Sequence, residues 1–544
     1  MSMKSEKRKM LFSLSTEELF FYICVAIMMG AKGLGLTEGQ KNFTLCMIAA
    51  AVSWCIKMCL TSYTLKEWLI LSLSMIIGSI IYLRTGEKAA LAAVMFVVGM
   101  KNISLGRLMK VCLGVWGITF LTAIAMGLLG IQEGVIVVHE KLGLGPIIRY
   151  SLGFTHPNVL HVSYFILVML IIYVMRPQGK RLYWLIFFLL LGNLYIFLYS
   201  ISYTGIIIVG IYLFMCLYFD LRKKCGNLEK IILHCVFLFS VAFPIMGPFV
   251  LKGKAFIFFN KLLSTRFELV YNIFRENQLS LFGTRMRISI NPGTHLTLDS
   301  SFAYLLMNYG IVAFIFFVTL YFLVVHYCIS HNRLQETAIL LSVAVAGITE
   351  QFLFNLSFKN ITLFIMGSIL FEYILNSTTE YKWNRGYKII KKEDRIINIQ
   401  LLDCLYSYFN SCKEIVSAKW RYLLSGGVIF AVALLVIYGI SYKTMDYIIV
   451  EKYSTDYRGE DEFIIGKDTI LPDDNYISVG DVSIGNGAYK FYGNILVIEN
   501  VRNVISIFVW GISSGIAMTI VLIKNRTQKR GCIITEHQRN YTNR

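Results

Sequence analysis

Fourteen long apolar runs constrain the fold of this 544-residue chain more than any other feature of its sequence. The hydrocarbon core of a bilayer is about 30 Å thick, and one helix of about 20 apolar residues crosses it. A segment in lipid must satisfy its own backbone hydrogen bonds, which favours helices. We therefore predict an all-α polytopic membrane protein with about 14 transmembrane helices. The predicted spans are residues 17–36, 43–60, 68–84, 87–101, 108–131, 159–175, 182–199, 203–219, 229–251, 302–326, 336–354, 359–375, 422–441 and 501–523.

Composition and charge exclude the main alternatives. Hydrophobic residues make up 56% and charged residues 16% of the chain, whereas soluble proteins usually carry about 25% charged residues. So few charges cannot cover a soluble protein of this length, and so apolar a chain is not intrinsically disordered. The net charge of +19 would suit nucleic acid. Most of the basic residues stand in loops between apolar runs, so we expect no nucleic-acid partner.

Those basic loops predict the orientation of the chain, because cytoplasmic loops carry an excess of Lys and Arg. With fourteen spans, both terminal tails and the most basic short loops fall on one side, which we expect to be the cytoplasm. Three long loops, 132–158, 252–301 and 442–499, are then exterior. Loop 252–301 is nevertheless basic, which indicates an anionic ligand on that face. The alternative is a solvated amphipathic helix, since loops this long orient weakly by charge.

The chain divides into four parts. Residues 1–376 form a membrane domain of about 12 helices, and 377–421 form a basic cytoplasmic linker. Residues 422–523 are an appendix of two helices around a small β-rich exterior domain, 442–499, and 524–544 are a basic cytoplasmic tail. In the last span, Gly511 and Gly515 form a GxxxG pattern that favours close packing against another helix.

Motifs for nucleotide or metal chemistry are missing from the sequence. It contains no phosphate-binding P-loop, no dinucleotide fingerprint, no HExxH pattern and no Cys/His cluster. We therefore expect no cofactor, no metal site and no nucleotide-driven pump.

The polar stretch from Arg149 to Asn158 stands where an exterior loop meets a span. Arg149 could hold a phosphate bidentately. His156 and Asn158 could bond sugar hydroxyls, and His156 could also move a proton. The alternative is a simple helix start, with Thr155 as the cap and Pro157 in the first turn.

Two further polar stretches also lie at exterior span ends. In the basic loop, Arg266 is expected on a short helix between spans, and Arg285 and Arg287 follow a turn at Gly283. The alternative for all three arginines is a solvated surface. Asp299, at the mouth of the next span, is either a general base or a helix cap.

A fourth stretch, from Thr349 to Asn360, includes Glu350, which is the main acidic candidate near an exterior helix end.

These pieces, in this order, resemble the Wzy-type bacterial polysaccharide polymerases of the O-antigen ligase/polymerase superfamily. The resemblance covers about residues 1–376. Tyr203 stands where the family often has arginine, and Asp299 stands where the ligase branch often has histidine, which favours a polymerase. The resembling pieces are Arg149 with Leu152-Gly153-Phe154 and His156-Pro157-Asn158, Ser202-Tyr203-Thr204-Gly205, Arg266 before Leu281-Phe282-Gly283, Asp299 before Tyr309-Gly310, and Glu350 before Asn360.

The resemblance implies a membrane glycosyltransferase that polymerises polyprenyl-pyrophosphate-linked oligosaccharide repeats for a capsule, an exopolysaccharide or O-antigen. The reaction would take place at the exterior face of the bacterial cytoplasmic membrane and would release polyprenyl pyrophosphate. The implied partners are the lipid-linked oligosaccharide and membrane lipid, with a chain-length regulator and a flippase of the same pathway.

Site roles follow from the same resemblance. Arg266 and Arg285 are expected to neutralise the leaving diphosphate in place of a metal, and Asp299, followed by Glu350 and then His156, is expected to be the base. The substrate-binding residues are expected to be Arg149, His156, Asn158 and Arg287.

Two other activities remain open from the sequence. A flippase or transporter for lipid-linked oligosaccharide would also use many spans and a basic cavity, but it would hold its charged site near the midplane of a repeated fold. A ligase would move finished glycan to another acceptor.

Overall fold

The computed structural model describes most of the membrane domain and parts of the appendix. The described residues are 13–129, 131–132, 136–141, 145–263, 265–285, 298–355, 357–375, 397–398, 400–441, 448–451, 454–457, 462–466, 482–484, 488–491 and 494–542.

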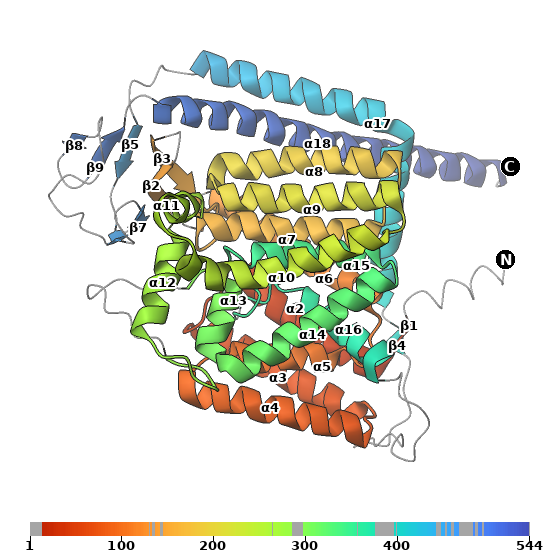
Figure 1. The fold of residues 1–544 in the computed structure, drawn as a ribbon. Coiled ribbons are helices and arrows are strands. Elements are labelled where there is room, and N and C mark those ends of the chain that lie inside the picture. Colours follow the sequence, from red (N-terminus) through yellow and green to blue (C-terminus); the bar gives the residue numbers. More distant parts are fainter. Residues whose placement is uncertain are drawn as a thin grey trace.

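Helices dominate this structure, and each of the fourteen apolar runs contains one (Figure 1). Ten helices among the described residues are long and apolar enough to cross a membrane. The protein is therefore an all-α, multi-pass membrane protein. The helices are α2 (Thr16–Gly33), α3 (Lys41–Leu60), α4 (Leu65–Thr85), α5 (Ala89–Gly99), α6 (Leu105–Leu128), α7 (Pro157–Met175), α8 (Lys180–Ser200), α9 (Tyr203–Arg222), α10 (Asn227–Val250), α11 (Gly253–Leu262), α12 (Arg266–Glu276), α13 (Ser301–Tyr304), η1 (Leu305–Tyr309), α14 (Gly310–Ser330), α15 (Leu334–Ala346), α16 (Thr362–Ile369), η2 (Leu370–Leu375), α17 (Gln400–Ser441) and α18 (Asn494–Thr542).

The prediction of a span over 336–354 is wrong at its C-terminal end. Helix α15 ends at Ala346, and residues 347–361 form an irregular segment before α16. Backbone groups of this segment bond to other parts of the protein instead of to a continued helix. The Gly347 carbonyl, for example, accepts a hydrogen bond from the backbone N–H of Ser301 at 2.9 Å. The polar residues around Glu350 therefore lie outside a helix.

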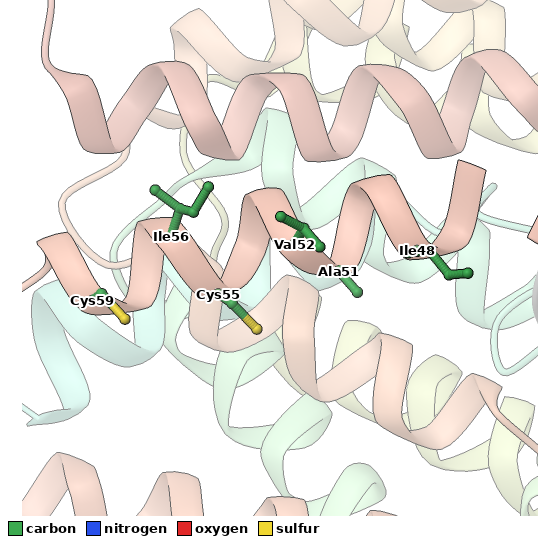
Figure 2. A pocket seen from close by; sticks show the side chains of 6 residues that line it. All are labelled: Ile48, Ala51, Val52, Cys55, Ile56 and Cys59. Carbon is green, nitrogen blue, oxygen red and sulfur yellow. The ribbon is translucent and has the colours of Figure 1, made fainter. Parts of the chain in front are cut away.

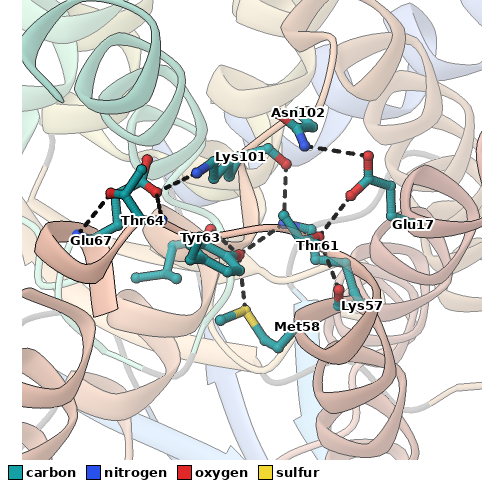
Figure 3. A network of polar contacts seen from close by, with 10 residues as sticks. Glu17, Lys57, Met58, Thr61, Tyr63, Thr64, Glu67, Lys101 and Asn102 are labelled. Carbon is teal, nitrogen blue, oxygen red and sulfur yellow. Dashed lines mark hydrogen bonds and ion pairs between the residues drawn. The ribbon is translucent and has the colours of Figure 1, made fainter. Parts of the chain in front are cut away.

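A polar network links the ends of helices α2, α3, α4 and α5 (Figure 3). The Lys57 ammonium, fully buried, donates to the Tyr63 hydroxyl at 3.2 Å and to the Lys101 carbonyl at 3.0 Å. Glu17 accepts from Thr61 at 2.8 Å, and Glu67 pairs with Lys101. A buried charge is tolerated only when it is paired and hydrogen-bonded, so this network stabilises the joint between α2, α3, α4 and α5.

The outer helix faces are apolar, as lipid contact requires. On α3, a shallow groove is lined only by apolar residues and two cysteines (Figure 2). Ile48 and Val52 of this groove are 56% and 53% exposed. Such a surface would be an aggregation hazard in water, but in a bilayer it meets acyl chains. The groove lining is Ile48, Ala51, Val52, Cys55, Ile56 and Cys59.

The described part of loop 252–301, which the sequence predicts to be exterior, contains two short helices of different character. Helix α11 buries none of its residues and exposes Ile257 and Phe258 by more than half, as expected for a helix at a membrane interface. Helix α12 instead buries Arg266, Phe267 and the apolar residues of the same face. For Arg266, the alternative of a solvated surface is therefore wrong.

The appendix helices α17 and α18 pack along each other, and α18 also lies against α8 (Figure 1). A Cβ at Gly511 would lie 2.5 Å from the Cα of Ala431, and one at Gly515 would lie 2.7 Å from the carbonyl oxygen of Gly426. The predicted close packing at the GxxxG pattern is confirmed.

Short strands accompany the appendix and the loop before α7. Strands β2 (Ile136–Lys141) and β3 (Gly145–Tyr150) form a hairpin, which joins β7 (Glu462–Gly466) and β6 (Ser454–Tyr457) in a four-stranded antiparallel sheet of order β3-β2-β7-β6. Strands β5 (Ile448–Glu451), β9 (Ala488–Phe491) and β8 (Val482–Ile484) form a second sheet. The third sheet pairs β1 (Ser13–Leu14) with β4 (Ile397–Asn398).

The expected part boundaries at the C-terminus differ in detail from the structure. Helix α18 begins at Asn494, so the last residues of the exterior domain 442–499 are helical, and the tail 524–544 is helical as far as Thr542. Within the expected linker 377–421, residues 377–396 and 399 lie outside the described part of the chain. From Gln400 onward the linker is helical, with a break at Lys419.

Candidate active site

A buried arginine between two carboxylates forms the centre of the site. Arg266 stands at the first position of α12, after Thr265 in a left-handed conformation, and is 8% exposed. Its Nη2 lies 3.3 Å from Oδ2 of Asp299 and 3.6 Å from Oε1 of Glu350. Nε donates to the Thr349 carbonyl at 2.7 Å, and Nη1 donates to the Leu263 carbonyl at 3.1 Å. The guanidinium plane is therefore fixed, and it brings together three residues that the sequence singled out.

The two carboxylates differ in environment. The Asp299 side chain is 40% exposed, whereas that of Glu350 is 14% exposed. Burial raises the pKa of Glu350 to about 6, and the nearby Arg266 and a hydrogen bond from Thr204 at 3.2 Å oppose that rise. A carboxylate with a pKa close to neutrality is well suited to take up and release a proton.

The alternative that Asp299 is only a helix cap is wrong. Ser300 is the N-cap of α13, and its hydroxyl accepts from the backbone N–H of Ala303. The same segment is bound to the irregular stretch after α15, because Ser301 bonds to Gly347 through its backbone and to the Glu350 carbonyl through its hydroxyl. These contacts position Asp299 and Glu350 on either side of Arg266.

A second buried arginine lies at the end of β3. Arg149 is 2% exposed. Its Nε donates to the Ser200 carbonyl at 2.7 Å, and its Nη2 donates to Oδ1 of Asn158 at 2.6 Å. The expected pair of Arg149 and Asn158 is therefore in contact.

His156 has a local structural role beside that pair. It is the N-cap of α7, and its Nδ1 accepts from the backbone N–H of Asn158 at 3.1 Å. The prediction that Thr155 caps this helix is wrong. Pro157 occupies the first turn, as expected, because its missing N–H costs nothing there.

The segment from Ser200 to Thr204 joins the two arginine centres. Ser200 accepts from Arg149, while Thr204 donates to Glu350. The Ser202 hydroxyl caps α9 and lies 3.3 Å from the Thr204 hydroxyl. Four residues span at most about 14 Å, so the two centres lie near each other at this end of the helices.

Arg285 lies apart from these contacts. It is exposed and follows the turn at Gly283, whose φ is +88°. The turn rests on the helix break at Gly310, with the backbone N–H of Thr284 donating to the Met307 carbonyl at 3.0 Å. Within the described residues, Arg285 does not contact Arg266, Asp299 or Glu350. The prediction for Arg287 falls outside the described residues.

Three further polar residues lie near the site: Lys359 belongs to the stretch from Thr349 to Asn360 that the sequence singled out, without a predicted role, whereas His161 and Asn193 were not predicted. Lys359 is 6% exposed, and its charge lowers the pKa of Glu350. His161, buried on α7, bonds to the hydroxyl of Ser200 at 2.9 Å and to Asn193 at 2.7 Å. A polar residue inside an apolar run is the only sequence signal for His161 and Asn193.

Comparisons with protein-family models, curated proteins and solved structures find no match to this chain. Among the described residues, no group of three or more His, Cys, Asp and Glu side chains is arranged to hold a metal ion.

Proposed function

We propose that this protein joins polyprenyl-pyrophosphate-linked oligosaccharide units into a polysaccharide at the exterior face of the bacterial cytoplasmic membrane. The observation that carries the proposal is the buried Arg266 between Glu350 and Asp299. A cation beside a carboxylate of raised pKa suits a reaction in which a hydroxyl loses a proton while an anionic group departs.

In the proposed reaction, a hydroxyl of one unit gives its proton to a carboxylate and attacks the anomeric carbon of a second unit. The bond from that carbon to the diphosphate oxygen breaks, and its electron pair leaves with polyprenyl pyrophosphate. We favour Glu350 as the base, because its pKa of about 6 lies closer to neutrality than that of an ordinary carboxylate. Asp299, 3.3 Å from Arg266, then helps to orient the incoming hydroxyl.

Arginines supply the positive charge for the departing diphosphate. Arg149 and Arg266 are both buried, which strengthens their interaction with an anion relative to water. Arg285 and Arg287 follow in the same exterior loop and are proposed to meet the diphosphate as it enters. No step of this mechanism requires a metal ion.

The membrane arrangement completes the proposal. We propose fourteen crossings, counting α2, α5, α15 and α16 together with the ten long helices. Both termini then lie in the cytoplasm, and helix α12, part of the basic loop 252–301, lies at the exterior face. This places the site where lipid-linked units are presented outside the membrane.

The proposal is tested with purified protein in nanodiscs and lipid-linked repeat units from the source organism. We expect a ladder of polymers in the presence of a chelator and without nucleotide. Glu350→Gln should lower the rate at least about a hundredfold, the usual contribution of a general base. The matched control is Glu268→Gln, on the exposed face of α12, which should keep the ladder.

Other products would replace the proposal with another function. Transfer of a single glycan to a different acceptor, with no ladder, would indicate a ligase. Movement of intact lipid-linked units across the bilayer, with no joined product, would indicate a flippase. A full ladder from Glu350→Gln would remove that residue from the role of base.

A further inference from the structure

Arg502 of the appendix is buried against the membrane domain, far from the predicted site residues in sequence. It stands on α18 and is 2% exposed. Its Nε donates to the Leu198 carbonyl at 2.9 Å, and its Nη2 donates to the Ile148 carbonyl at 3.2 Å. Nη1 pairs with Glu499, one turn earlier on α18. Arg502 therefore binds two segments of the membrane domain at once.

Those two segments are the ones that carry the Arg149 centre. Ile148 directly precedes Arg149 on β3, and Leu198 stands two residues before Ser200, whose carbonyl accepts from Arg149. The Arg502 guanidinium also lies over the rings of Tyr150, at 4.6 Å, and Tyr199, at 5.4 Å. The residues next to Arg149 and next to Ser200 are thus in contact with the same side chain of the appendix.

Two further attachments join the appendix to this region. The hydroxyl of Ser506 bonds to that of Tyr199, and Nε1 of Trp510 donates to the Tyr195 hydroxyl at 3.1 Å. Strand β7 pairs with β2, the partner of β3 in the hairpin that ends at Tyr150. The appendix thus holds β3 through the sheet on one side and through α18 on the other.

Docking alone would not need a buried arginine. Helix α18 already packs closely on α17 through glycine, and burying a guanidinium is costly unless its donors are satisfied. The planar fork of arginine fixes the geometry of the groups that it binds, which a lysine or an apolar side chain does not. We therefore expect the buried Arg502 to fix the placement of β3 relative to the end of α8.

We propose that Arg502 is a positioning residue of the candidate site and that the appendix, residues 422–523, is part of its machinery. Arg502 holds Ile148 and Leu198 so that Arg149 faces the Ser200 carbonyl, in the placement in which the proposed function has it meet an anionic group. The inference that this anion is a diphosphate rests on the proposed function. The inference that Arg502 fixes the placement of β3 against α8 does not rest on the proposed function.

The test uses the full chain and measures two quantities separately, which are the local stability of β3 and the end of α8 and the affinity for an anion. Hydrogen–deuterium exchange of peptides covering 145–150 and 198–205 reports the placement, and inorganic pyrophosphate titration reports the anion. The variants are Arg502→Lys, Arg149→Lys, their double variant and the control Ser513→Ala, an exposed residue of α18 that bonds only within its own helix. Glu499→Gln serves as a second variant that leaves Arg502 in place.

In Arg502→Lys, we expect exchange of both peptides to be about tenfold faster, because the opening of a local unit follows the bonds that hold it. Pyrophosphate should bind about tenfold more weakly to either single variant, and the double variant should show little further loss, since both changes act through Arg149. Ser513→Ala should match the unaltered protein. Glu499→Gln should show the same pattern as Arg502→Lys, to a smaller extent.

Unchanged exchange of both peptides in Arg502→Lys and in Glu499→Gln would overturn the positioning role. Effects on pyrophosphate affinity that multiply in the double variant would show that Arg502 does not act through Arg149, which also overturns it. Faster exchange together with no pyrophosphate binding by the unaltered protein would uphold the positioning role and count against the proposed function.

Discussion

At the scale of single residues, the site depends on how Arg266 shares its donors. Two of its nitrogens bond to backbone carbonyls, and the third faces two carboxylates. Burial of Glu350 raises its pKa to about 6. The same environment also contains Thr204 and Lys359, which oppose that rise. The proton affinity of Glu350 is therefore set by neighbours from three separate segments.

A pH profile tests this account of Glu350. A base works only when it is deprotonated, so activity should rise as the pH rises through about 6. Thr204→Val removes a hydroxyl that lowers the pKa of Glu350, so the rising limb should move to higher pH. The expected displacement is about one pH unit, the equivalent of one hydrogen bond to a charged group. Initial rates of polymer formation from pH 4.5 to about 8.5 measure it.

The control for this profile is Thr44→Val, an exposed threonine at the start of α3 that bonds only to a local carbonyl. It should leave the profile unchanged. A limb that stays in place, or moves to lower pH, in Thr204→Val would contradict the assignment of Glu350 as the titrating base.

At the scale of elements, the ends and joints of helices position the site more than the helix bodies do. Helix α15 stops at Ala346, and the irregular segment that follows carries both Thr349 and Glu350. Helix α8 stops at Ser200, where Ile201 has a φ of +40°. Polar backbone groups freed at such ends accept from the two arginines, as at other interrupted helices that line sites in membrane proteins.

The pairing of α17 with α18 is the joint that brings Arg502 to the site, and Gly511 tests it. A side chain there would collide with the backbone of Ala431, since a Cβ would lie 2.5 Å from its Cα. Gly511→Leu should therefore destabilise the protein by about 1–3 kcal/mol, the usual cost of overpacking. Thermal unfolding in detergent measures this as a lower midpoint.

The matched control is Gly439→Ala, on the exposed face of α17, where a Cβ would meet no atom within 4 Å. It should leave the midpoint unchanged or raise it slightly, because alanine favours a helix over glycine. Equal midpoints for Gly511→Leu and Gly439→Ala would show that the two helices do not depend on this contact.

At the scale of the whole molecule, the described strands and short helices of the three long loops lie at one end of the helical body. Strands β2 and β3, helices α11 and α12, and the appendix strands lie there, while the C-terminal end of α18 projects from the opposite end (Figure 1). The candidate site lies at the same end as these loops, where β3 and α12 supply its two arginines. A site at one end of the helical body supports the proposed enzyme over a transporter, whose site would lie near the midplane.

Labelling with a membrane-impermeant maleimide tests the orientation. In a cysteine-free background, Lys254→Cys on α11 should react in intact cells, and Lys224→Cys, after α9, should react only after permeabilisation. Both positions are exposed in the structure. We expect this pattern because the loops on the side of Lys224 carry an excess of Lys and Arg, which predicts that they lie in the cytoplasm. The reverse pattern would contradict both the orientation and the proposed exterior reaction.

The choice of cap at the mouth of α13 illustrates where sequence reasoning ends. Asp299 and Ser300 are adjacent, and both residue types cap helices well. The structure assigns the cap to Ser300 and leaves Asp299 beside Arg266. That outcome depends on bonds between residues 300–301 and residues 347–350, which no local pattern near Asp299 reveals.

The sequence by itself determined the class of molecule, the existence of its membrane helices and several residues of its site. Apolar runs of sufficient length form helices in lipid for local reasons, because each helix satisfies its own backbone. Only the tertiary structure decided which polar groups meet. Arg266, Glu350 and Thr204 come from three distant segments, and Arg502 reaches the Arg149 strand from the appendix. Such contacts depend on helix packing and on where helices end, and these are properties of the assembled molecule.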